Sequence, residues 1–234
     1  MRETNDALRR QSERDPLTGL LNRDGLLCEL KRHGQLETFT GTVLLVDIDH
    51  FKSINDAVGH AGGDVVLREV SQRLQSCLRE GDLVVRWGGE ELVVAVLSVP
   101  FDADALVDRI MQSISTNPVR FQKREIVVSA SIGYGTFPIA ELGRSTSFDE
   151  SLAVADAGMY YAKRNGRSAA VRIVTLPSAL LADLGGLPSA LEIGALQGSV
   201  RLTIRRIVAG SPNPASSAAA DDVLLLLEAS QSCP

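Results

Sequence analysis

Long apolar segments are missing from this chain of 234 residues. The longest uninterrupted apolar run, residues 92–97, has six residues, whereas roughly 20 are needed to cross a bilayer. The first ten residues are charged and contain no apolar stretch, so we expect neither a membrane span nor a secretory signal. Disorder over the whole chain is also excluded, because 44% of the residues are apolar and the net charge is only −5.

Cysteine and net positive charge are also scarce. The three cysteines, Cys28, Cys77 and Cys233, are odd in number and have no metal-ligand spacing, which favours reduced thiols and a cytoplasmic protein. A sequence pI near 5.3 argues against a broad nucleic-acid-binding surface. A small polyanionic ligand remains compatible with this charge if local cations or metal ions receive it.

The composition changes near residue 174. The last 73 residues contain no aromatic side chain, and only eight of the 60 residues from Thr175 onward are charged. We therefore expect a linker helix over residues 1–14, a compact domain over 15–174, and an extension of unknown role over 175–234. Within the extension, residues 199–208 predict a strand, and an apolar run follows at 223–227.

Strands and helices alternate within the main domain. Residues 43–49, 83–87, 92–97 and 126–134 read as strands, the middle two forming a hairpin of buried strands across Gly88 and Gly89. Apolar residues at helical spacing predict a helix that opens near Asp64 and others over 106–114 and 148–162. This pattern predicts an α+β fold in which helices pack on a largely antiparallel sheet.

Acidic residues follow the predicted strands. Asp47 and Asp49 are expected on one side of a strand end because side chains alternate, and Glu90 and Glu91 fall at the hairpin tip. Such carboxylates suit Mg²⁺, which usually shares its oxygen ligands with substrate phosphates. The alternative is that these acids are simply solvated.

Residues 51–64 contain few core positions and three glycines, Gly59, Gly62 and Gly63, which would let backbone N–H groups approach a phosphate. Neither GxxxxGK[ST] nor GxGxxG occurs in the chain. Alternative structural roles exist for Asn55 as a turn residue and for Asp64 as a helix-start residue.

Five motifs in order resemble the GGDEF family of bacterial diguanylate cyclases. The string DIDHFKSINDAVGHAGGD over residues 47–64 and the string RWGGEEL over 86–92 are similar to the family signature, here in a GGEEL form. Residues 15–23, 129–133 and 155–167 match further family motifs. The resemblance covers about residues 14–174.

This resemblance implies a fold like that of nucleotide cyclases and the polymerase palm, and condensation of two GTP into cyclic di-GMP with release of two pyrophosphates. It also implies two Mg²⁺ ions per active site, with Mn²⁺ as a possible substitute, and a homodimer in which two substrate-bound protomers face each other. Metal binding falls on Asp47, Glu90 and the carbonyl of Ile48. Catalytic roles fall on Asp47, Glu90, Glu91 and Lys52, with Glu90 activating the hydroxyl.

The resemblance also implies nucleotide-binding roles for a larger set of positions. Guanine recognition falls on Asn55 and Asp64, because a carboxylate can accept from the N1–H and N2 amine of guanine. The other substrate-binding positions implied are Phe51, Lys52, His60, Gly88, Gly89, Lys163 and Arg167. The spacing of Lys163 and Arg167 puts both on one helical face, where a helix C-terminus would favour them even without a ligand.

Arg79 and Asp82 form an RxxD pattern five residues before the paired glycines. Many family members carry an inhibitory site for their own product there, and arginine suits bidentate recognition of phosphate or a guanine edge. A surface ion pair is the alternative.

The sequence departs from the family pattern at Leu92, where Phe is usual, and at Gly158, which should weaken the last helix.

Two other functions are alternatives to an active cyclase. One is a catalytically silent module that binds GTP or cyclic di-GMP as a receptor, and the other is a regulatory domain that acts only through protein contacts. Complete acids at Asp47, Glu90 and Glu91 favour an active cyclase.

Overall fold

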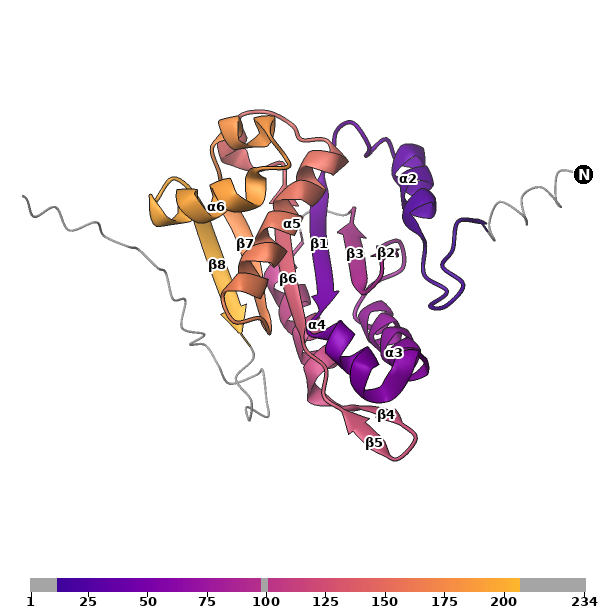
Figure 1. The fold of residues 1–234 in the computed structure, drawn as a ribbon. Helices are drawn as coiled ribbons and strands as arrows, with labels where there is room; N and C mark the ends of the chain where they lie inside the picture. The colour runs from indigo at the N-terminus through magenta and orange to yellow at the C-terminus, as the bar shows by residue number, and fades with distance from the viewer. Residues whose placement is uncertain (1–11, 98–100, 207–234) are drawn as a thin grey trace, which may run out of the picture.

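The computed structural model describes residues 12–97 and 101–206, and these form a main sheet of six strands between two layers of helices, with a second sheet of two strands (Figure 1). Its main elements are α2 (Arg23–Arg32), β1 (Gly41–Ile48), α3 (Phe51–Ser76), β2 (Leu83–Gly88), β3 (Glu91–Val96), α4 (Ala103–Thr116), β4 (Val119–Phe121), β5 (Arg124–Ile126), β6 (Ala130–Phe137), α5 (Phe148–Arg164), β7 (Ala169–Thr175), α6 (Leu187–Leu196) and β8 (Arg201–Arg206). None of the helices in these ranges is long and apolar enough to cross a membrane.

The strand order of the main sheet is β2-β3-β1-β6-β7-β8. Strand β1 pairs antiparallel with β3 and β6, β6 pairs parallel with β7, and β7 pairs antiparallel with β8. The expected α+β fold with a mostly antiparallel sheet is therefore confirmed. This topology brings the ends of β1 and β8 and the starts of β3, β6 and β7 to one edge of the sheet.

Both faces of β1 are buried, as its apolar sequence predicts. Leu44 and Val46 pack in a cluster with residues of α3 and α4, whereas Val43 and Leu45 pack with residues of α2, α5 and α6. The alternation of side chains thus gives the sheet two separate cores. Leu92 is fully buried in the first of them, so the residue that replaces the usual Phe is a packing residue.

Helix α3 consists of two helical segments joined at a kink, and both begin before the predicted position near Asp64. It begins at Phe51 and continues through a kink at Gly59, whose φ of 76° and ψ of 166° are not helical. The prediction was wrong because three glycines in five residues lower helix propensity, while packing compensates: Gly62 and Gly63 are buried. The reading of Asp64 as a residue that starts a helix is also wrong.

The single strand predicted over residues 126–134 is two separate strands. β5 ends at Ile126 and pairs with β4 in a small hairpin that projects from the body of the molecule, and β6 begins only at Ala130 (Figure 1). Between them, Ser129 donates a hydrogen bond of 2.7 Å from Oγ to Asp49 Oδ2. This contact turns the chain from the hairpin into the sheet.

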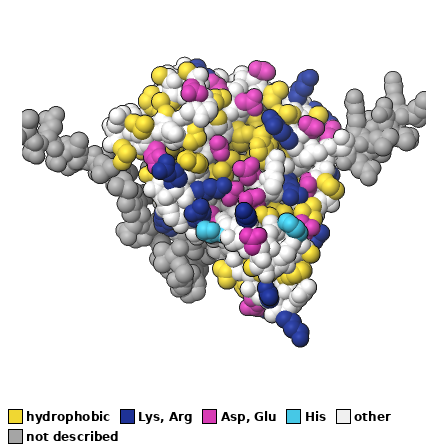
Figure 2. Space-filling view, in the orientation of Figure 1, with side chains coloured by type: hydrophobic (Ala, Val, Ile, Leu, Met, Phe, Trp, Pro, Cys, Tyr) yellow, Lys and Arg dark blue, Asp and Glu magenta, His cyan; other side chains and the backbone are white. Residues whose placement is uncertain are grey.

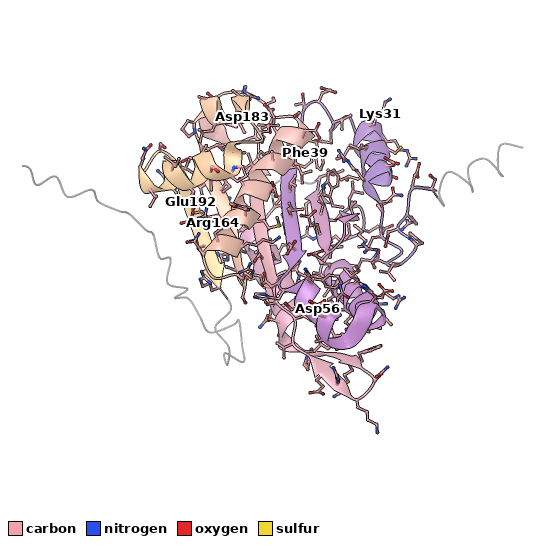
Figure 3. All side chains as sticks on the ribbon, in the orientation of Figure 1. Lys31, Phe39, Asp56, Arg164, Asp183 and Glu192 are labelled. Carbon is pink, nitrogen blue, oxygen red and sulfur yellow. The ribbon has the colours of Figure 1, made fainter. Side chains whose placement is uncertain are left out.

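Part of the C-terminal extension belongs to the sheet. The strand predicted at 199–208 is observed as β8, and it pairs along β7 from Arg201 to Arg206. Helix α6, which periodicity did not predict, packs on α5, where Arg164 and Glu192 form an ion pair of 2.9 Å (Figure 3). Residues 1–11, which make up most of the predicted linker helix, and the run at 223–227 lie outside the described residues, and the domain division at 174 stays a prediction.

Candidate active site

Three carboxylates meet at the edge of the sheet where β1 ends. Asp47 lies opposite Glu91 in the β1–β3 ladder, and Glu90 occupies the two-residue turn between β2 and β3. Gly89, the other turn residue, has a φ of 48°, a left-handed conformation that glycine adopts readily. The structure therefore brings together the three acids that the sequence predicted. Figure 2 shows acidic and basic side chains intermingled near the centre of this face of the molecule.

Asp47 is almost fully buried, at 4% exposure, and Lys163 is its cationic partner. The Lys163 ammonium lies 2.7 Å from Asp47 Oδ2. Burial raises the pKa of Asp47, and the charges of Glu90 and Asp49 act in the same direction, whereas Lys163 opposes the shift. The pKa of Glu91 is also raised, by burial first and then by the charge of Asp47.

The crowding of these acids fits a divalent cation. Burial first, and then neighbouring negative charge, raise the pKa of Asp47 and of Glu91, and a bound cation would offset both effects. Carboxylate and carbonyl oxygens are the ligands that Mg²⁺ prefers. Within residues 12–97 and 101–206, no three His, Cys, Asp or Glu side chains form a complete metal-binding group. An ion held by Asp47, Glu90 and the Ile48 carbonyl would thus need further oxygen ligands from water or substrate.

Asp49 has a different role from Asp47. Its carboxylate accepts hydrogen bonds from Ser129 Oγ and Ser131 Oγ at 2.7 and 2.6 Å, and from the Ser168 backbone N–H at 3.0 Å. These bonds satisfy a carboxylate that is only 4% exposed. Asp49 therefore ties the end of β1 to the start of β6 and to the turn before β7.

The kinked helix α3 carries the predicted nucleotide-binding residues. Lys52 and His60 are exposed, whereas Phe51 is 8% exposed and packs in the apolar core. A Cβ atom at Gly63 would lie 1.9 Å from Asn55 Oδ1. Gly63 thus leaves room for the Asn55 amide, which packs across the kink against the residue before Asp64.

Lys163 and Arg167 do not share a helical face, so that expectation was wrong. Helix α5 ends at Arg164, and Arg167 follows Gly166 in a left-handed turn with a φ of 58°. The Arg167 N–H donates to the Ala162 carbonyl at 2.9 Å, which folds the turn back under the helix end. The explanation of Arg167 as a cation in the last helical turn fails for the same reason.

Arg86 holds the turn between β2 and β3 and was not predicted as a site residue. Its Nε and Nη2 donate to the Gly89 carbonyl at 3.1 and 2.9 Å, and its Nη1 lies 3.1 Å from Asp15 Oδ2. Although burial acts to raise it, hydrogen bonds from Thr18 and Arg86 hold the pKa of Asp15 below its usual value. The signal available in the sequence was the position of Arg86 two residues before Gly88.

The RxxD residues form a turn at the opposite end of β2 from the acids. The Asp82 N–H donates to the Arg79 carbonyl at 3.2 Å, and the Arg79 N–H donates to Asp82 Oδ2 at 3.0 Å. The Arg79 guanidinium lies 5.4 Å from the centroid of the Phe101 ring. Both residues line a cleft of about 300 Å³ together with Arg14 and Gln75.

Comparison with known proteins places this fold and site in a class. Residues 12–169 match the family described as "Diguanylate cyclase, GGDEF domain". The chain therefore belongs to the GGDEF family, as its motifs predict.

Relatives of known name share this domain. The chain is 37% identical over 155 residues to a probable diguanylate cyclase, DgcF, of Escherichia coli K12, covering 66% of this chain and 49% of that protein. It is 38% identical over 130 residues to diguanylate cyclase A of Treponema denticola, covering 55% of this chain and 34% of that protein. The chain thus spans about half the length of the E. coli relative, at 49%, and a smaller part of the Treponema relative, at 34%.

Solved structures confirm the fold class. Diguanylate cyclase SiaD of Pseudomonas aeruginosa, solved with its activator SiaC, matches with a TM-score of 0.62 and 38% identity over 74% of this chain and 66% of SiaD. The coiled coil and GGDEF domain of DgcB from Caulobacter crescentus, solved with c-di-GMP, matches with a TM-score of 0.60 and 26% identity over 71% of this chain and 88% of that one.

Proposed function

We propose that this protein is a diguanylate cyclase that condenses two GTP molecules into cyclic di-GMP and releases two pyrophosphates. The observation that carries this proposal is the meeting of Asp47, Glu90 and Glu91 at one edge of the sheet, beside Lys163. A site with three acids and a cation at a strand end suits transfer of a nucleotidyl group, because it can remove a proton and neutralise phosphate charge.

In each half-reaction, the 3′-oxygen of one GTP bonds to the α-phosphorus of the other, and the bond from that phosphorus to the pyrophosphate breaks. Glu90, at the turn tip, is the proposed acceptor of the 3′-hydroxyl proton. Asp47, Glu90 and the Ile48 carbonyl would hold the divalent ions, two Mg²⁺ with Mn²⁺ as a substitute, which polarise the hydroxyl and neutralise the phosphates. Lys52, Lys163 and Arg167 add positive charge on the phosphate side.

Guanine selection is assigned to Asn55 and Asp64. The position of the Asn55 amide against Gly63 supports this proposal, because it brings Asn55 across the kink to the residue that precedes Asp64. A carboxylate accepts from the N1–H and N2 amine of guanine, which adenine does not present. His60 and the glycines of the turn are assigned to the surroundings of the nucleotide.

A single protomer holds half of the reactants, so catalysis is assigned to a homodimer with two sites facing each other. Product feedback is assigned to Arg79 and Asp82. Their position in an open cleft at the other end of β2 supports a ligand site that is separate from the acids.

Incubation of the purified protein with GTP and Mg²⁺, followed by chromatography and mass spectrometry, tests the proposal. We expect cyclic di-GMP from the wild type and from the surface control Glu37→Gln, and none from Glu90→Gln or Asp47→Asn. Full product formation by either acid variant would remove the roles assigned here.

A receptor remains the second candidate, because a relative 34% identical over 166 residues is named cyclic di-GMP phosphodiesterase NbdA rather than a cyclase. Saturable binding of GTP or cyclic di-GMP by the wild type, without any turnover, would favour the receptor. Neither binding nor turnover would favour a domain that acts through protein contacts.

A further inference from the structure

The turn that joins α5 to β7 has an unfavourable backbone. Three successive residues have positive φ, 102° at Gly166, 58° at Arg167 and 45° at Ser168. Two of the three carry side chains, for which the left-handed conformation is disfavoured. A turn of this kind persists where the surrounding structure holds it.

The backbone N–H groups of this turn are bonded to residues that lie within the region matched to the GGDEF family. The Ser168 N–H donates to Asp49 Oδ2 at 3.0 Å, and the Arg167 N–H donates to the Ala162 carbonyl at 2.9 Å. Through Asp49, the turn is therefore connected to the end of β1, two residues after Asp47. It also directly follows the helix end that carries Lys163.

The backbone carbonyl groups of the turn accept hydrogen bonds from a residue that lies beyond the region matched to the GGDEF family. Arg206, the last residue of β8, donates from Nη1 to the Arg167 carbonyl at 3.1 Å and from Nη2 to the Asn165 carbonyl. Its planar guanidinium thus satisfies two carbonyl groups of the turn that follows α5. The match to the GGDEF family ends at residue 169.

Independent contacts fix the position of β8. Its six residues pair along β7, and Arg205 Nε lies 2.7 Å from Asp108 Oδ1 on α4. Because neighbouring side chains of a strand point to opposite faces, Arg205 reaches α4 on one face of the sheet while Arg206 reaches the α5 turn on the other. The ends of β1 and β8 lie at the same edge of the sheet (Figure 1).

We propose that β8 is part of the active-site scaffold and that Arg206 is a positioning residue. It holds residues 166–168 in their left-handed form and thereby places Lys163 and Arg167 for the nucleotide phosphates. This inference rests on the proposed function for its ligand. The contact itself, between an arginine of the extension and the strained turn, is a feature of this chain.

Binding of a GTP analogue with a methylene group between the α- and β-phosphorus tests the inference without turnover. Arg206→Ala should weaken binding about five- to tenfold, the range of one net hydrogen bond. Arg206→Lys should fall between Arg206→Ala and the wild type, because it keeps the charge but loses the two-pronged geometry. The matched control is Arg201→Ala, an exposed arginine at the other end of the same strand, which should bind like the wild type.

A second substitution separates positioning from a direct role of Arg206. Glycine adopts the φ of residue 168 without penalty, so Ser168→Gly in the Arg206→Ala background should restore much of the lost binding. Equal binding by Arg206→Ala and Arg201→Ala, or no recovery in the double variant, would overturn the proposal.

Hydrogen exchange distinguishes this inference from the proposed function. The amide protons of Arg167 and Ser168 should exchange faster in Arg206→Ala than in Arg201→Ala, with or without nucleotide. A wild type that neither binds the analogue nor forms product would overturn the cyclase assignment. Unchanged exchange at both amides would overturn the positioning role of Arg206 whatever the activity.

Discussion

Glu91 faces Asp47 across the β1–β3 ladder, so these two carboxylates repel each other in the free protein. Burial and the charge of Asp47 raise the pKa of Glu91 above its usual 4.5. In the pH range between 4.5 and this raised pKa, the folded protein binds more protons than the unfolded chain. Stability therefore falls as the pH rises through this range, and that loss persists at neutral pH.

We expect Glu91→Gln to stabilise the free protein at neutral pH while lowering turnover, because the amide removes a charge that the fold disfavours. The melting temperature should rise by a few degrees at pH 8, and the decline between pH 5 and pH 8 should be shallower than in the wild type. Thermal unfolding of Glu91→Gln beside the exposed control Glu37→Gln provides the measurement. A lower melting temperature at pH 8 would show that Glu91 contributes favourably to the fold.

Asp64 is expected to set the choice between guanine and adenine. In Asp64→Ser, the carboxylate that would accept from guanine is lost, so discrimination against ATP should weaken by about tenfold or more. A competition assay with GTP and ATP measures this discrimination in Asp64→Ser and in the exposed control Asp56→Ser on the same helix. An unchanged preference would limit Asp64 to a structural role in α3.

Residue types and spacing predicted the acid cluster, but the contacts that hold it in place could not be predicted from the sequence. Asp47, Glu90 and Glu91 follow from strand ends and a hairpin, which are local features. The Lys163–Asp47 ion pair and the Arg86 clasp on Gly89 join segments that only the folded chain brings together. The misplacement of Arg167 has a local cause, because Asn165 and Gly166 end α5 one turn earlier than the i, i+4 pattern assumes.

At the scale of elements, two glycines let α5 lie against the sheet. A Cβ at Gly133 on β6 would lie 1.9 Å from the Ala155 carbonyl oxygen, and a Cβ at Gly158 would lie 3.0 Å from the Val171 oxygen and 3.2 Å from Gly133 Cα. Gly158 is thus a close-packing position in a continuous helix, although its sequence suggested a weak point.

We expect Gly158→Ala to destabilise the protein despite its better helix propensity. Alanine gains about 1 kcal/mol of propensity, whereas overpacking costs about 1–3 kcal/mol, so the net loss should be at most about 2 kcal/mol. Gly133→Ala should be worse, because its Cβ would overlap backbone rather than touch it. Urea unfolding of both variants gives the ranking, and a stabilised Gly158→Ala would mean that α5 can move away from β6 at little cost.

The turn between α3 and β2 is the element to which feedback is assigned. Arg79→Ala removes a guanidinium that lines the cleft, so the cyclic di-GMP concentration for half-inhibition should rise by about tenfold or more, within the usual range of allosteric coupling. Initial rates should stay close to those of the wild type. Progress curves with added product, beside Arg120→Ala on the projecting hairpin as control, decide between this site and a plain surface turn.

Element boundaries were predicted best where apolar periodicity is strong. β1, β3 and α5 come within about two residues of expectation, because burial on a face dictates their patterns. The start of α3 and the split of β5 from β6 depend on glycine packing and on the serine bonds to Asp49. Neither leaves a periodic signal in the chain.

At the scale of the whole molecule, we expect turnover to require a dimer. When the protein concentration lies below the dimer dissociation constant, turnover per protomer should rise in proportion to concentration and then level off. Rates over a hundredfold dilution series, with the association state followed by light scattering, test this. A rate per protomer that is constant while the protein is monomeric would contradict catalysis between facing sites.

The two outer strands of the sheet are protected from aggregation in different ways. At β2, the chain around Leu21 covers the edge, with hydrogen bonds from the Leu21 N–H to the Val84 carbonyl at 3.3 Å and from the Arg86 N–H to the Leu21 carbonyl at 2.8 Å. β8 is the last strand on its side within the described residues, and three of its six residues are arginine. Arg205 is paired with Asp108, but Arg201 and Arg206 are exposed. Like charges on two such strands repel, so these two arginines discourage copies of the protein from pairing through β8. Neutralising its arginines would therefore lower solubility as well as alter the turn beside it.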